Sequence, residues 1–96
     1  MRYAAHMIEM IMDGIKDMHM WTGYAMNALE DGRPDMADWF KRKIKDRLEH
    51  TRSCWDEVAR ELEIKRRAND GDVIAAAMMS MIGCRITEIE REYEAI

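Results

Sequence analysis

The sequence predicts an all-α protein, an up-down-up bundle of three helices. Apolar residues recur at three-and-four spacing in three segments, and turn residues cluster only at Glu30 to Asp35 ("EDGRPD") and Ala68 to Asp72 ("ANDGD"). No segment alternates polar and apolar residues over a useful length, so no strand is expected. The 96 residues are expected to form one domain, residues 1–96, small enough for oligomerisation to add buried surface.

The first helix is predicted over residues 3–30. Its apolar residues fall on one stripe, because about 100° separates successive residues of a helix. We expect this stripe to face the core; its members are Ile8, Ile11, Ile15, Met18, Thr22, Ala25 and Leu29.

The second helix is predicted over residues 34–68. Pro34 suits its first turn, where the missing N–H costs little, and Asp35 and Asp38 suit the positive end of the helix dipole. The short connection at Gly32 makes the first two helices antiparallel. The expected core residues of this helix are Phe40, Ile44, Leu48, Thr51, Trp55, Val58 and Leu62.

The third helix is predicted over residues 72–95, with large apolar residues on one stripe: Met78, Ile82, Ile86, Ile89 and Tyr93. Small residues form a second stripe on the same helix, where a solvated face would carry Lys and Glu: Ala76, Ala77, Ser80, Gly83, Cys84 and Thr87. A mid-helix glycine costs about 1 kcal/mol relative to alanine unless close packing offsets it. We therefore predict a homodimer or higher even oligomer paired through this stripe. The alternative is that helix one of the same chain covers it.

Composition excludes several classes of protein. The 15 Lys and Arg against 19 Asp and Glu give a net charge of −4 with both signs interspersed, which disfavours nucleic acid as a partner. Acidic residues at Glu9, Asp13 and Asp17 interrupt the N-terminal apolar residues, so neither a signal peptide nor a membrane span of about 20 residues is expected. The two cysteines, Cys54 and Cys84, have no CxxC spacing, and a cytoplasmic location is the default.

Residues Tyr24 to Val58 resemble the first two helices of the ferritin-like, rubrerythrin-type superfamily, especially its short phage-associated members. The shared features are a Tyr-Ala pair, a Pro turn, and an aromatic residue some ten positions before a His. They are carried here by Tyr24, Ala25, Pro34, Ala37, Phe40 and His50. The resemblance implies a helical bundle with phage or prophage origin.

The resemblance also implies a di-iron centre, which in that family needs carboxylates from separate helices and a Glu-x-x-His pair on one inward face. Three positions before His50 stands Arg47, a permanent cation that does not coordinate metal. Where phage-type members tend to carry a further His, five residues after the first, this chain has Trp55. The site is therefore expected to be eroded.

A residual site for iron or another divalent metal stays open as an alternative, because Asp46 and His50 are at i, i+4 and Asp17 and His19 lie on helix one. Asp17 falls more than about 100° from the apolar stripe, so a solvated carboxylate is preferred. For His19 we prefer a buried, hydrogen-bonded ring, and for His50 a histidine at the rim of the core beside a buried Cys54 thiol.

The 11 methionines cluster in the first and third helices, and core filling or contact with another chain is preferred over soft-metal ligation. We expect no catalytic residues and no cofactor. The sequence therefore predicts a non-catalytic structural or protein-interaction bundle. The alternative is a small metal-binding or redox protein whose site is completed across a dimer.

Overall fold

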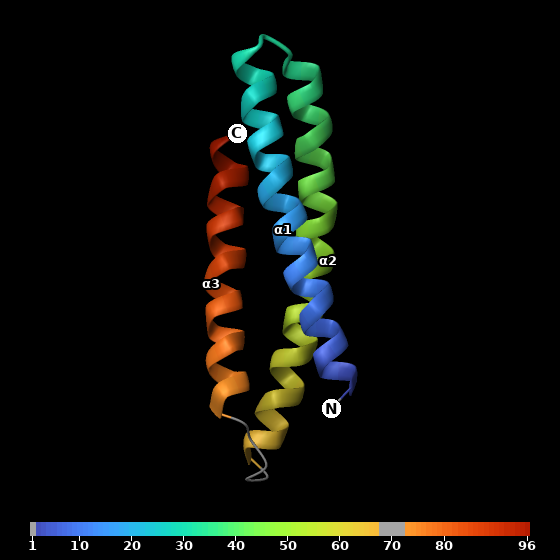
Figure 1. The fold of residues 1–96 in the computed structure, drawn as a ribbon, viewed down its shortest axis with the longest axis vertical. Coiled ribbons are helices and arrows are strands. Elements are labelled where there is room, and N and C mark those ends of the chain that lie inside the picture. The colour runs from blue at the N-terminus through green and yellow to red at the C-terminus, as the bar shows by residue number, and fades with distance from the viewer. Residues whose placement is uncertain (1, 68–72) are drawn as a thin grey trace.

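In the computed structural model the chain folds into three helices (Figure 1), and the structure describes the backbone of residues 2–67 and 73–96 and the side chains of residues 6–61 and 77–96. The helices are α1 (Arg2–Glu30), α2 (Pro34–Arg67) and α3 (Val73–Ala95). The up-down-up order and all-α class are confirmed, with helix boundaries within one residue of those predicted. The predicted ends at residues 68 and 72 lie outside the described backbone.

The turn between α1 and α2 follows from its glycine. Gly32 has φ +71°, a left-handed conformation that residues with a Cβ rarely adopt. The Arg33 N–H donates to the Ala28 carbonyl at 2.8 Å and the Gly32 N–H donates to the Leu29 carbonyl at 3.1 Å, which satisfies the last carbonyls of α1. Pro34 then begins α2. Proline has no backbone N–H, and at the first position of a helix that N–H would have no acceptor within the helix.

The core is a continuous stripe contributed by all three helices: Met7, Ile11, Ile15, Met18, Ile44, Cys54, Val58, Met79, Ile82, Ile86 and Ile89. α1 and α2 pack against each other far more extensively than either packs against α3. The bundle is long and thin, 55 × 18 × 14 Å, and the tip formed by α1 and α2 extends beyond the C-terminus of α3 (Figure 1).

Most of the predicted core positions that the structure describes are buried, and two are exposed. Five others are partly buried, namely Ile8, Phe40, Leu48, Trp55 and Tyr93. Leu29 is 44% exposed, because it lies at the tip, where two helices cannot cover each other's whole circumference. Met78 is 42% exposed and its neighbour Met79 is buried instead. α2 contacts α3 at this level, since the Trp55 indole N–H donates to the Met79 carbonyl at 3.0 Å. The Leu62 side chain lies outside the described residues.

Gly14 allows α1 and α2 to approach closely. A Cβ placed on Gly14 would lie 2.6 Å from Thr51 Oγ1 and 3.1 Å from Arg47 Nε, both on α2. Thr51 is fully buried, and neither its hydroxyl nor Arg47 Nε has a hydrogen-bond partner among the described groups. Gly23, on the same helix, has nothing within 4 Å of the corresponding position.

Gly14→Ala and Gly23→Ala are therefore expected to change stability in opposite directions. Gly23→Ala should raise the free energy of unfolding by up to about 1 kcal/mol, because alanine is the better helix former. Gly14→Ala should lower it by up to about 2 kcal/mol, because overpacking against Thr51 outweighs the same gain. Urea denaturation of both variants measures the difference. Equal stabilisation by the two substitutions would show that α1 and α2 are not in close contact at Gly14.

Candidate functional site

The structure pairs Asp17, one of the predicted metal ligands, with a cation. Arg47 Nη2 lies 3.9 Å from Asp17 Oδ2, and both side chains are partly exposed. The guanidinium thus occupies the space between α1 and α2, next to the helix-one carboxylate and one turn before His50. An arginine at this point repels a divalent cation and offers no lone pair to bind one.

Asp46 and His50 border an open surface hollow of about 320 Å³ on the same side, together with Trp21, Lys43 and Arg47. Both predicted ligands are exposed, and the hollow contains two permanent cations. The Lys43 ammonium lies 5.1 Å from the ring centre of Trp21 and 4.5 Å from that of Trp39, which holds positive charge over the aromatic surface. This hollow therefore favours anions over metal ions.

His50 lies next to the thiol of Cys54, one turn further along α2. Its Nε2 lies 3.8 Å from the Cys54 sulfur, and Cys54 is buried whereas His50 is exposed, which confirms the rim-histidine interpretation. The Cys54 side chain is only 6% exposed, whereas reactive thiols usually lie in partly exposed sites.

His19 was predicted to be buried, and that prediction is wrong. Its side chain is 69% exposed, and its Nδ1 lies 3.8 Å from Glu92 Oε2 on α3. The ring lies just outside the apolar stripe, where α3 does not pack closely enough against α1 to cover it. His19 therefore faces α3, whereas Asp46 and His50 border the hollow beside Trp21. Across the described residues, no three His, Cys, Asp or Glu side chains gather in a way that could hold a metal ion.

The small-residue stripe of α3 is partly covered within the chain. A Cβ on Gly83 would lie 3.0 Å from Trp55 Cζ2, so the indole of α2 packs directly on this glycine. At Gly83 the stripe is therefore covered within the chain, as the alternative expects. The covering helix is α2, whereas the alternative expects helix one. The other described members of the stripe are exposed, namely Ala77, Ser80, Cys84 and Thr87. The Ala76 side chain lies outside the described residues.

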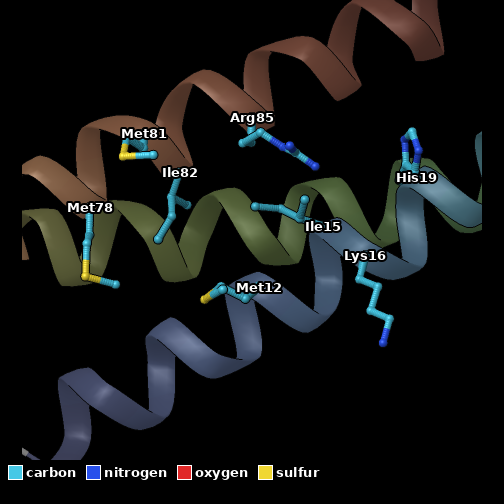
Figure 2. Close-up of a pocket in the computed structure, with 8 residues that line it drawn as sticks. All are labelled: Met12, Ile15, Lys16, His19, Met78, Met81, Ile82 and Arg85. Atoms are coloured by element: carbon cyan, nitrogen blue, oxygen red, sulfur yellow. The ribbon is translucent and has the colours of Figure 1, made fainter.

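A surface that the sequence analysis did not identify lies on the opposite side of α3. An open hollow of about 480 Å³ between α1 and α3, called here the methionine groove, is lined by Met12, Ile15, Lys16, His19, Met78, Met81, Ile82 and Arg85 (Figure 2). Met12 and Met81 are 54% and 69% exposed. The signal for it in the sequence is the position of Met12 and Met81 outside the apolar stripes. Methionines are expected from the sequence to fill the core or contact another chain, which does not distinguish a groove.

No protein-family model matches the chain, and no characterised protein or solved structure is similar enough to it to count as a match. The resemblance to the ferritin-like superfamily therefore stays a prediction. Of the residues that carry it, Tyr24 on α1 and Phe40 on α2 lie close together, with ring centres 5.5 Å apart.

We expect protein purified without a histidine tag to carry no stoichiometric iron, manganese or zinc, because Arg47 pairs with Asp17 and the remaining candidate ligands do not converge. Elemental analysis of the wild type and of His50→Ala measures this, and the two proteins should be indistinguishable. About one metal ion per chain in the wild type, lost in His50→Ala, would contradict the prediction and favour the metal-binding alternative.

Proposed function

We propose that the chain is a non-catalytic structural or protein-interaction bundle that works as a homodimer paired through α3. The observation that carries this proposal is the exposed face of α3 formed by Ala77, Ser80, Cys84 and Thr87, which presents small, uncharged side chains to solvent. An ordinary solvated helix face carries Lys and Glu at such positions.

The packing of α3 supports the same proposal. α3 contacts α1 and α2 over much less surface than they share with each other, so a second copy would add burial where the chain has least. The small side chains let two helices approach closely. Arg52, which pairs with Glu90 at 2.7 Å, borders this face and ties α2 to α3 beside it.

The described residues offer poor support for an enzyme. Cys54 and His50 come nearest to a nucleophile and a base, but the thiol is buried and separated from the ring nitrogen by 3.8 Å. A thiol buried to this extent is a poor nucleophile. A ferritin-like ancestry of phage or prophage origin belongs to the same proposal and rests on the resemblance of residues Tyr24 to Val58. The loss of its metal site is supported by Arg47 lying next to Asp17.

A cytoplasmic location completes the proposal, and it is supported by the two free cysteines, of which Cys54 is buried and Cys84 exposed. None of the described helices combines the length and apolar character that crossing a membrane requires.

Light scattering at micromolar concentration tests the dimer. Wild type is expected to be dimeric, and Ser80→Arg is expected to be monomeric with unchanged helix content, because an arginine would place a charge in the middle of the pairing face. Ser53→Arg is the matched control, since Ser53 is an exposed serine on α2, and it should stay dimeric.

A monomeric wild type would refute the proposal. A Ser80→Arg variant that stays folded and dimeric would place the interface on another surface.

A further inference from the structure

The methionine groove differs in character from one end to the other. Met12, Met78, Met81 and Ile82 surround one end, whereas Lys16, His19 and Arg85 lie at the other, with Ile15 between (Figure 2). α1 and α3 run in the same direction, so the apolar and cationic ends of their two faces coincide. The distance along α3 from Met78 to Arg85 is about 10 Å.

The apolar end suits a flexible hydrocarbon. Methionine side chains are unbranched and polarizable, and they adapt to the shape of an apolar ligand. Met78 and Met81 are exposed on α3 and Met12 is exposed on α1, so these side chains are free to close over a chain that lies between the helices. A hollow of about 480 Å³ is within the usual range for a small-molecule site.

The positive charges at the cationic end are only weakly neutralised by neighbouring acidic residues. Lys16 makes no ion pair with any described residue. Arg85 has a long contact, 4.0 Å from its Nε to Glu88 Oε2, and both side chains are mostly exposed, so this pair is weak. The guanidinium therefore keeps donors for another acceptor. Lys16 points away from Arg85 in Figure 2, so its flexible side chain must rotate toward α3 to bring the ammonium to the same group.

We propose that the methionine groove binds a single-chain amphiphile with one negative charge, namely a medium-chain fatty carboxylate. Its carboxylate is held by Arg85 and Lys16, and its alkyl chain lies along Met12, Met78 and Met81. A ligand head group with one negative charge suits this end of the groove. Glu88 and Glu92, which contact Arg85 and His19, already offset part of the positive charge there.

The distribution of charge favours this ligand over a docked acidic helix. A helix laid in the groove would present acidic residues along its length and would need cations along both rims. Here the charged side chains gather at one end, which matches a ligand with a head and a tail.

Titration with decanoate, below the concentration at which it forms micelles, tests the proposal in protein labelled with ¹³C at the methionine methyl groups. Saturable shifts are expected for Met12, Met78 and Met81. Met18, which is fully buried, and Met26, which is 54% exposed outside the groove, should not shift. The double variant Lys16→Gln/Arg85→Gln should weaken decanoate binding at least about tenfold, because two charge-assisted contacts are lost.

The matched control is Lys45→Gln/Arg60→Gln, which removes two exposed cations of α2 outside the groove and should leave binding unchanged. Decanol should bind much more weakly than decanoate. Equal binding of decanol, or no effect of the groove double variant, would overturn the proposal.

Two other outcomes would also overturn it. If the groove methyl signals shift with protein concentration in the absence of decanoate, a second copy occupies the groove. If decanoate shifts no groove methyl, the site does not exist. Ser80→Arg should bind decanoate as the wild type does, because Ser80 does not line the groove, so the dimer and the ligand site are tested separately.

Discussion

The close contact of α1 with α2 at Gly14 is the constraint on which the rest of the structure depends. Because Gly14 has no side chain, Thr51 and Arg47 lie directly against the backbone of α1. α1 and α2 also pack against each other more extensively than either packs against α3. α3 is then the outer element of the bundle, placed on one side of a pair that is already well packed.

The same contact determines the chemistry available between α1 and α2. With Arg47 against Gly14 and within 3.9 Å of Asp17, a guanidinium lies between α1 and α2 beside one of the predicted metal ligands. The loose position of α3 has a different consequence. It leaves a hollow on its side toward α1, the methionine groove, and an exposed face of small residues on another side. The surface proposed to bind a fatty carboxylate and the surface proposed to pair with a second copy thus both involve α3, the least tightly packed helix.

The helices could be predicted almost completely from the sequence, because Gly32, Pro34 and the "ANDGD" segment are local signals that need no knowledge of tertiary contacts. The rotation of α3 could not. Periodicity is compatible with either Met78 or Met79 facing the core, and the outcome depends on contacts between helices, such as the hydrogen bond from the Trp55 indole to the Met79 carbonyl. The exposure of His19 and the methionine groove have the same origin, since both depend on how far α3 lies from α1.

For the candidate site, the sequence shows which residue types are present but does not show whether they come together in space. Arg47 before His50 correctly indicated that a Glu-x-x-His pair is missing, because this is a matter of sequence alone. Whether Asp17, His19 and Asp46 meet depends on the relative rotation of α1 and α2, which the spacing within each helix does not define. The small-residue stripe of α3 follows from the sequence, but the coverage of its Gly83 by Trp55 is again a contact between helices.

A double-mutant cycle on Gly14→Ala and Thr51→Ala tests the central contact most directly, with the free energy of unfolding as the measured quantity. In the Thr51→Ala background the hydroxyl 2.6 Å from the added Cβ is gone, so Gly14→Ala should cost about 1 kcal/mol less than it does in the wild type. Such coupling is the result that the account predicts. Additive effects of the two substitutions would show that Gly14 and Thr51 do not meet, and would contradict the arrangement of α1 and α2 on which the account depends.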